Sequence, residues 1–539
     1  MSTSESSFLP EGKNKVSPRT QESVVAPHRL RRNVLSLPGV LFLCVAAIAP
    51  AASMIFNVPV MASQAGASTP FVFLLATVGV LLLGVSVASF ARRLSSAAGF
   101  STWVRHGLGE RAAFLAGWLM LGAYALFEAA LQATVGGSLD NGLAGAGVHL
   151  VGGWMTYAVL LTLIVGTLSY FALTVSLWVM APFAILEVLA LVILDLAISL
   201  RGGAAGHDLL HTFLPLGTTV QGVAPGGSLG IGVAMVLGVL AFVGFETGAV
   251  YGEEAREPKR TIPRAMVILI LGLAVLYTWT AYATTIGVGW TQAGTVLGNV
   301  NTVPQQYLHL ATTFVGSWLG IALLIFVITS NFASAFAMHQ AQVRYVFDMG
   351  RARIFPGFLG QTHPRWKSPA HASVLQTAFS LLVIGFLGLI LSHTNPDGRT
   401  IYTLGVATGG YWQQVNGTVS FGWLASIVTM CILIVYLLTN VAAFFFARRN
   451  REMHVWRHLI APAGSSLFLL LPLLAYVGPA LPGVGSFFTQ LGFAPTPFPS
   501  NILPLFVLGW IGVGWLYSVY LSRRFPERFA RMGSIITGT

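Results

Sequence analysis

Charged residues are scarce in this chain of 539 residues. Asp, Glu, Lys and Arg make up 9% of the sequence and hydrophobic residues 55%, whereas soluble domains carry about 25% charged residues. This composition argues against a water-soluble fold. Cysteine is scarcer still, since Cys44 and Cys431 both fall in apolar stretches and give no disulfide framework or metal-ligand spacing. We therefore expect neither a metal nor a cofactor.

Long apolar runs dominate what is present. A bilayer core of about 30 Å takes about 20 mostly apolar residues of helix, and lipid admits only helices or closed barrels, because these pair their own backbone groups. The sequence predicts an all-α integral membrane protein with twelve transmembrane helices. Their limits are 37–62, 70–91, 112–136, 152–173, 175–199, 228–251, 264–289, 316–341, 369–392, 420–447, 458–480 and 501–522.

The basic residues orient these helices. The net charge of +12 is spread in short clusters between apolar runs, which does not favour nucleic acid as a partner. With the amino terminus inside, all but two of the 29 Lys and Arg residues are cytoplasmic, the exceptions being Arg201 and Arg399, as the positive-inside rule requires. We predict a multi-pass protein of the plasma membrane with both termini cytoplasmic. Residues 1–36 are polar and are expected to form a disordered tail, not a signal peptide.

Four acidic residues fall within predicted spans: Glu128, Glu187, Asp195 and Glu246. A charge at the bilayer centre costs about 2.5 to 3.5 kcal/mol on insertion scales, so each must face protein or water. In the third span Tyr124, Glu128 and Gln132 recur every fourth residue, which places them on one face of the helix. We expect that face to line a cavity.

The fifth and eighth spans hold further polar groups. A buried carboxyl near mid-depth, such as Glu187, is suited to load and release a proton, whereas Asp195 at the outer end is expected to hydrogen-bond a neighbouring helix. His339, at the cytoplasmic end of the eighth span, is interpreted as a satisfied interfacial residue. Three other residues of that span could line an ion or proton site: Ser330, Asn331 and Ser334.

Two spans contain helix breakers near their middles. The first reads PAAS over 50–53, and Pro50 removes a backbone donor and crowds the preceding turn. The sixth reads FVGFETG over 242–248, where two glycines loosen the helix around Glu246. Breaks at corresponding places of two halves indicate a transporter site, because freed N–H groups can hold a carboxylate and freed carbonyls a cation. The separation of five spans predicts two five-helix inverted repeats.

Three loops resemble those of the amino acid/polyamine/organocation (APC) permeases. The most specific is GFETGAVYGEEAREPKRTIPRA over 244–265, followed by RYVFDMGRARIFP over 344–356 and SSAAGFSTWVRHGLGERAAFLAGW over 95–118. The second stretch departs from the family at Ala352 and Arg353, where an Asp-Gly pair is usual. The resemblance covers nearly the whole chain.

This resemblance implies a LeuT-type fold of five plus five helices with two peripheral helices. The implied units are a tail at 1–36, a first repeat at 37–199, a second repeat at 200–447, helices eleven and twelve at 448–522, and a cytoplasmic tail at 523–539. In some proton-coupled relatives a lysine of helix five takes the place of a sodium ion, and Glu187 holds that position here. Proton carriage by Glu187 becomes a hypothesis.

We predict a secondary active transporter for amino acids or related amines that works by alternating access, as a proton-coupled symporter or an exchanger. In such permeases the substrate lies between the unwound parts of helices one and six, where Phe242 and Phe245 are expected to help close the outer path. The predicted substrate-binding residues are Ala49, Pro50, Ala51, Ala52, Ser53, Tyr124, Glu128, Phe242, Val243, Gly244, Phe245 and Glu246. The predicted coupling residues are Glu187, Ser330, Asn331 and Ser334, of which the last three would serve if sodium replaced the proton.

Two other classes of protein stay open at this point. A nutrient sensor would bind an amino acid in the same kind of pocket without turnover. An integral membrane enzyme would need a histidine–acid pair or metal ligands at a membrane boundary, and the sequence shows neither. The sequence does not define the substrate or the oligomeric state.

Overall fold

A computed structural model describes most of residues 35–531. The gaps are 95–98, 145–146, 149, 172, 215–228, 252–253, 299–302, 391, 395–399, 403–416, 482 and 491–499. The amino-terminal tail predicted at 1–36 therefore lies almost wholly outside the described residues, as do Arg399 and the last eight residues of the carboxyl-terminal tail.

Helices make up nearly all of the described chain. In the first half they are α1 (Leu37–Ile48), α2 (Pro50–Ala65), α3 (Thr69–Ala91), α4 (Phe100–Leu108), α5 (Glu110–Ala144), α6 (Trp154–Tyr170), α7 (Leu173–Arg201) and α8 (Leu210–Phe213). In the second half they are α9 (Leu229–Leu240), α10 (Thr247–Val250), α11 (Pro258–Val288), α12 (Gln305–Phe314), α13 (Ser317–Arg351), α14 (Ala370–Gly385) and α15 (Gly417–Arg449). The remainder are α16 (Ala461–Val477), α17 (Gly485–Gln490), α18 (Leu503–Arg524) and α19 (Pro526–Arg531). Two short strands, β1 (Ser392–Thr394) and β2 (Thr400–Tyr402), pair antiparallel.

Nine stretches of the described residues are long and apolar enough to cross a membrane. The first, Leu37–Ala91, contains the first two predicted spans. Two shorter apolar helices, Trp154–Tyr170 and Gly230–Leu240, lie within the fourth and sixth predicted spans. Peripheral helices turn large apolar side chains outward, as Leu505, Phe506 and Leu516 of α18 do, and such a surface suits lipid. The protein is therefore a multi-pass helical membrane protein.

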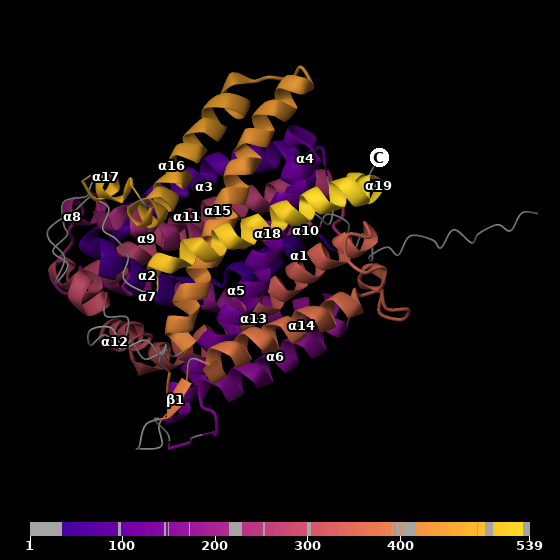
Figure 1. The fold of residues 1–539 in the computed structure, drawn as a ribbon. Helices are drawn as coiled ribbons and strands as arrows, with labels where there is room; N and C mark the ends of the chain where they lie inside the picture. Colours follow the sequence, from indigo (N-terminus) through magenta and orange to yellow (C-terminus); the bar gives the residue numbers. More distant parts are fainter. Residues whose placement is uncertain are drawn as a thin grey trace, which may run out of the picture.

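The order of elements occurs twice along the chain. An interrupted helix, α1 and α2, is followed by α3, the short α4 and the 35-residue α5. Later the interrupted pair α9 and α10 is followed by α11, the short α12 and the 35-residue α13. The two short helices lie at opposite ends of the bundle, α4 near α19 and α12 near β1 (Figure 1).

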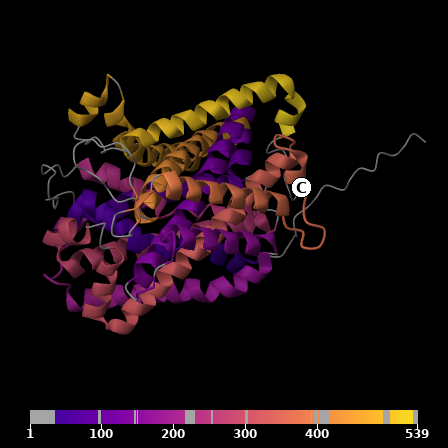
Figure 2. The same cartoon turned by 60° about the horizontal axis from the view of Figure 1, so that its bottom comes forward.

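The long helices α5 and α13 pack against each other at the centre of the bundle. Helix α6 contacts both α5 and α14, so that α5, α6, α13 and α14 form one group, here called the scaffold helices. Helix α18 runs along the outside of the bundle in both views (Figures 1 and 2). Its attachment to α5 includes stacked Trp118 and Trp510, whose indole N–H groups each donate to the other's carbonyl.

Candidate functional site

The first helix is interrupted at Ala49, as predicted. Ala49 adopts a left-handed conformation with φ 52° and ψ 68°, between the end of α1 and Pro50 at the start of α2. The interruption leaves backbone carbonyl groups without helical donors. Two hydroxyl groups donate hydrogen bonds to these carbonyls. Ser53 Oγ donates to the Ile48 carbonyl at 2.7 Å, and Ser334 Oγ of α13 donates to the Ala47 carbonyl at 2.6 Å.

The sixth predicted span is interrupted as well. Helix α9 ends at Leu240 and α10 begins at Thr247, with a series of turns between them. Gly244 within these turns has φ 116°, and a Cβ atom built there would lie 2.8 Å from the Ile48 nitrogen. Only glycine fits both the backbone angle and this close approach. The two interruptions are therefore in direct contact.

Glu246 stabilises the second interruption. Its Oε2 accepts the backbone N–H of Gly244 at 2.9 Å, and its Oε1 accepts the hydroxyl of Tyr124 of α5 at 3.1 Å. The side chain is fully buried. Through these contacts Glu246 orients the break between α9 and α10.

A small cavity lies beside the two interruptions, with a volume of about 20 Å³. That volume holds about one water molecule. The lining residues are Ile48, Ala49, Ala52, Ser53, Phe56, Asn57, Phe127, Leu131, Leu240, Val243, Asn331, Ser334 and Phe421. Among the described residues the Asn57 Oδ1 atom has no hydrogen-bond partner, although Asn57 is only 3% exposed. A buried acceptor of this kind is suited to an ammonium or hydroxyl donor.

The structure places only some of the predicted binding residues at this cavity. Ala49, Ala52, Ser53 and Val243 line it, together with the predicted coupling residues Asn331 and Ser334. The other predicted binding residues of the described chain do not line it: Pro50, Ala51, Tyr124, Glu128, Phe242, Gly244, Phe245 and Glu246. The expectation that the polar face of Tyr124, Glu128 and Gln132 opens into a cavity is wrong for this cavity, since that face contacts α13, α14 and the second interruption instead.

Aromatic residues close one side of the cavity. Phe421 of α15 packs against Phe56 of α2 and Phe127 of α5, with ring centroids 6.3 and 6.4 Å apart. Phe242 and Phe245, which the sequence suggests for this role, pack instead against Tyr277 and Tyr436. Both side chains are fully buried.

The two carboxyls of α7 lie in different surroundings. Glu187 is 2% exposed and faces Ser330 of α13, close to Tyr277 and the first interruption. Asp195 is fully buried and accepts the hydroxyl of Thr280 of α11. The contact of Asp195 with a neighbouring helix is therefore confirmed.

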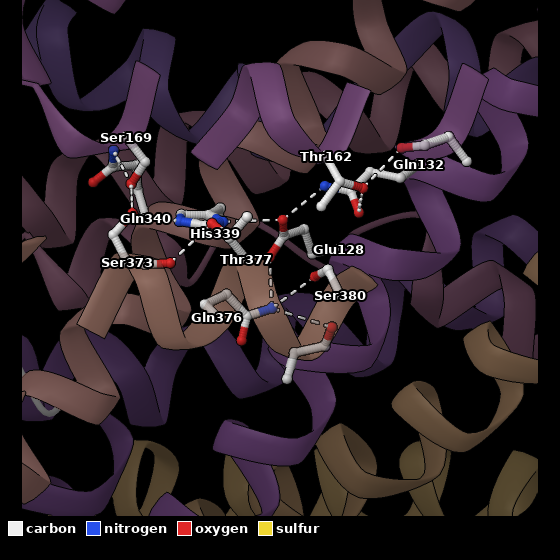
Figure 3. Close-up of polar contacts among 12 residues, drawn as sticks. Glu128, Gln132, Thr162, Ser169, His339, Gln340, Ser373, Gln376, Thr377 and Ser380 are labelled. Carbon is white, nitrogen blue, oxygen red and sulfur yellow. Dashed lines mark hydrogen bonds and ion pairs between the residues drawn. The ribbon is translucent and has the colours of Figure 1, made fainter. Parts of the chain in front are cut away.

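Glu128 belongs to a buried polar network among the scaffold helices (Figure 3). Its Oε1 accepts from His339 Nδ1 at 3.0 Å and from Gln132 Nε2 at 2.7 Å, and its Oε2 accepts from Gln376 Nε2 at 2.6 Å. Glu128 and His339 are both fully buried. The interpretation of His339 as an interfacial residue is wrong, because α5 and α14 enclose it on α13.

The network continues from His339 toward the end of α13. Its Nε2 lies 2.9 Å from Ser373 Oγ, which lies 2.9 Å from Ser169 Oγ of α6. Ser169 accepts from Gln340 Nε2 at 3.1 Å, and Gln340 Oε1 accepts from Arg344 Nη1 at 3.1 Å. A continuous chain of hydrogen bonds therefore joins Glu128 to Arg344.

Arg344 forms a buried ion pair that we call the inner latch. Its Nε and Nη2 atoms donate to both oxygens of Glu254, at 2.7 to 3.0 Å. The guanidinium also lies over the Tyr251 ring, 4.6 Å from its centroid. The segment that enters α1 is held at the same place, since Leu35 N donates to the Glu254 carbonyl at 3.1 Å. The latch thus ties α13 to the segment after α10 and to the entry of α1.

Sequence reasoning missed the residues that meet only through packing. Phe127 and Phe421 lie in different apolar spans with no local signal, and their pairing depends on how α5 and α15 pack. Asn57 carried a usable signal, as a polar residue two turns after Pro50 on the same helix. The histidine–acid pair of His339 and Glu128 could be recognised only if the faces of the third and eighth spans were compared.

Two interrupted membrane helices that meet beside a small cavity are typical of secondary-transporter folds. The family model described as amino acid permease matches residues 35–522. The chain therefore belongs to the amino acid permease family. This confirms the resemblance to the APC permeases that the three loops indicated.

Relatives that are named for a transported substrate are distant in sequence. The chain is 26% identical over 325 residues to the branched-chain amino acid permease BcaP of Bacillus subtilis, covering 57% of this chain and 65% of BcaP. It is 24% identical over 322 residues to the low-affinity putrescine importer PlaP of Escherichia coli K12, covering 59% of this chain and 67% of PlaP. It is 25% identical to the vacuolar cationic amino acid transporter 4 of Arabidopsis thaliana, covering 56% of this chain and 50% of that transporter. The chain thus spans about two thirds or less of the length of these relatives.

Proposed function

We propose that this protein is a secondary transporter that carries an amino acid or a related amine by alternating access. The observation that supports this most directly is the small size of the cavity beside the two interruptions. With room for about one water, it cannot admit an amino acid unless helices move. The relatives are named for branched-chain amino acids, putrescine and cationic amino acids, which supports a substrate that carries an amino group.

The proposed architecture is twelve transmembrane helices in two inverted repeats of five, at 37–199 and 200–447, with α16 and α18 outside them. The repeated order of elements supports it, as does the placement of α4 and α12 at opposite ends of the bundle (Figure 1). In an inverted repeat, equivalent elements lie on opposite sides of the membrane. We also propose the plasma membrane as location, with both termini cytoplasmic as the positive-inside rule predicts.

The cavity offers complementary groups for an amino acid. The first turn of α2 presents N–H groups without helical acceptors, at the positive end of the helix dipole, and Ala52 of this turn lines the cavity. These groups would receive the substrate carboxylate. Asn57 Oδ1 would accept from the substrate ammonium group, and Phe127 and Leu131 would contact the side chain.

Two barriers enclose the proposed site. With the amino terminus inside, the inner latch of Arg344 and Glu254 closes the cytoplasmic path, and Phe421 with Phe56 and Phe127 closes the outer path. The outer barrier joins elements of both proposed repeats. The inner latch joins two segments of the second repeat and holds Leu35 at the entry of the first. Movement of α1, α2, α9 and α10 relative to the scaffold helices would therefore open one barrier at a time.

Proton coupling through Glu187 is part of the proposal. A buried carboxyl is stable when neutral or when paired, and Glu187 lies where the first interruption meets α13, beside Ser330. Proton binding there would alter the contact that moves during transport. Among the sodium candidates, Ser334 already donates to a carbonyl freed by the interruption.

Purified protein reconstituted in liposomes tests the proposal. Radiolabelled L-leucine and putrescine serve as probes, with an inward proton gradient, a sodium gradient or unlabelled substrate inside. We expect accumulation of one probe above equilibrium under the proton gradient, and its loss in Glu187→Gln. Stoichiometric binding without lumenal filling would indicate a sensor, and accumulation that follows only sodium or internal substrate would reject proton coupling.

A further inference from the structure

We propose that the Nε2 atom of His339 is a proton-binding site whose occupancy is linked to the inner latch through Ser373, Ser169 and Gln340. The inference rests on the proposed alternating access, because it assigns a proton sensor to the barrier on the cytoplasmic side. This site is separate from Glu187. Glu187 faces Ser330, which precedes His339 by nine residues, or about 13 Å along α13.

The closed latch fixes the orientation of one amide in the chain. Gln340 Oε1 accepts from Arg344 Nη1 at 3.1 Å, so Gln340 Nε2 must be the group that faces Ser169. An amide nitrogen only donates. Gln340 therefore donates a hydrogen bond to Ser169 for as long as Arg344 remains in place.

Two arrangements of hydrogens fit the rest of the chain, because serine hydroxyls turn to suit their partners. In the first, Ser169 donates to Ser373 and Ser373 donates to His339 Nε2, so the imidazole is neutral. In the second, Nε2–H donates to Ser373 and Ser373 donates to Ser169, so the imidazole carries a proton on both nitrogens. In both arrangements Nδ1–H donates to Glu128. Figure 3 shows these side chains in sequence from Gln340 to Glu128.

The closed latch favours the first arrangement. There each group donates to the next, from Gln340 to Glu128, and aligned hydrogen bonds strengthen one another. In the second, Ser169 receives hydrogens from both Gln340 and Ser373. Turning the Gln340 amide would restore the alignment by offering Oε1 to Ser169, but that oxygen is held by Arg344. A proton on His339 therefore favours loss of the bond between Arg344 and Gln340 Oε1. This removes one of the bonds that hold the guanidinium, the others being to the Gln340 carbonyl and to Glu254, and so weakens the latch.

Among the described residues that contact His339, Glu128 is the one that can pair with a charged imidazole. Of the described elements around it, α5 presents the carboxylate of Glu128, while α6 and α14 present Ser169 and Ser373. The next carboxyl toward the substrate site is Glu246, bonded to Tyr124 one turn before Glu128 on α5. Because Glu128 accepts three donors and is fully buried, it can compensate the charge of an imidazolium without a rearrangement of its own.

Native Cys44 provides a reporter for the latch without any substrate. It is fully buried on α1, in contact with Thr247 of α10, and lies close to Tyr251, the ring that Arg344 covers. In a Cys431→Ser background, the rate of Cys44 labelling by a small maleimide is measured between about pH 5 and pH 8, where histidines titrate. Each rate is divided by that of the SDS-unfolded protein at the same pH, which removes the effect of thiol ionisation.

We expect the normalised rate to rise severalfold as the pH falls. His339→Gln should abolish this rise. Ser169→Ala should abolish it as well, since it breaks the chain and leaves the contact of His339 with Glu128 in place. His458→Gln is the matched control, because this buried histidine bonds Ser89 and lies outside the chain, and it should respond like the parent protein.

A parent protein without a pH response would overturn the proposal, and so would a full response in His339→Gln. A full response in Ser169→Ala with none in His339→Gln would reject the chain as the link. Melting temperature and monodisperse elution identify variants that fail to fold. If His339→Gln fails to fold, the response of Ser169→Ala alone decides the proposal. Since no substrate is used, failure of transport in liposomes does not affect this result.

Discussion

The cavity beside the interruptions and the polar network of the scaffold helices are built in opposite ways. The cavity is lined largely by alanine, phenylalanine and other apolar side chains, and its Asn57 Oδ1 has no partner in the described structure. In the network, the carboxylate of Glu128 has three donors and both nitrogens of His339 have partners. Unsatisfied groups leave a site ready for a ligand, whereas satisfied ones hold helices in one arrangement. Mutations should therefore separate binding from stability.

The largest effect should come from removing the acid of the network. Glu128→Leu leaves His339, Gln132 and Gln376 without their common acceptor, and breaking a buried pair from one side costs about 3–5 kcal/mol. We expect a markedly lower melting temperature in detergent. Glu110→Leu on the same helix is the control, since Glu110 forms only an exposed pair with Arg105, of about 0–1 kcal/mol. Equal melting of the two variants would show that the network does not stabilise the fold.

An intermediate effect should come from the contact between the interruptions. Gly244→Ala places a Cβ against the Ile48 backbone at a φ of 116°, with strain of about 1–3 kcal/mol. We expect uptake to fall by about tenfold or more, with a smaller change in melting than for Glu128→Leu. Gly272→Ala is the control, because nothing lies within 4 Å of its added Cβ on α11. Normal uptake by Gly244→Ala would mean that the close approach is not required.

The smallest effect should come from the unpaired acceptor of the cavity. Asn57→Ala should weaken the affinity for whichever probe is transported, L-leucine or putrescine, by about tenfold or less, which corresponds to about 1 kcal/mol. Its melting temperature should not change. Asn440→Ala should behave in the opposite way, since Asn440 is bonded to Ser86 and Ser466 away from the cavity. If Asn440→Ala weakened binding and Asn57→Ala did not, Asn57 would not be the acceptor that binds the substrate.

The sequence was sufficient for features that arise within one helix. Pro50 and the glycines around Glu246 predicted both interruptions, because these residues act on their own backbone. Apolar run length predicted the nine stretches of the described chain that are long and apolar enough to cross a membrane, for the same reason. The pattern of Tyr124, Glu128 and Gln132 correctly placed three polar groups on one face of α5.

The sequence was insufficient where two distant helices meet. A polar face indicates that a partner is needed, but not whether that partner is a cavity or another helix. Glu128 meets His339, 211 residues later, and a crossing between helices so far apart in sequence leaves no local pattern. Phe421 replaced Phe242 and Phe245 as the cavity's aromatic cover for the same reason.

The small volume of the cavity also bears on the electrical properties of the membrane. A permanently hydrated path through the bundle would short-circuit a proton gradient, since a file of water conducts protons. A cavity of about 20 Å³ holds about one molecule and cannot support such a file. In this form the described cavity therefore offers protons no continuous file of water to follow.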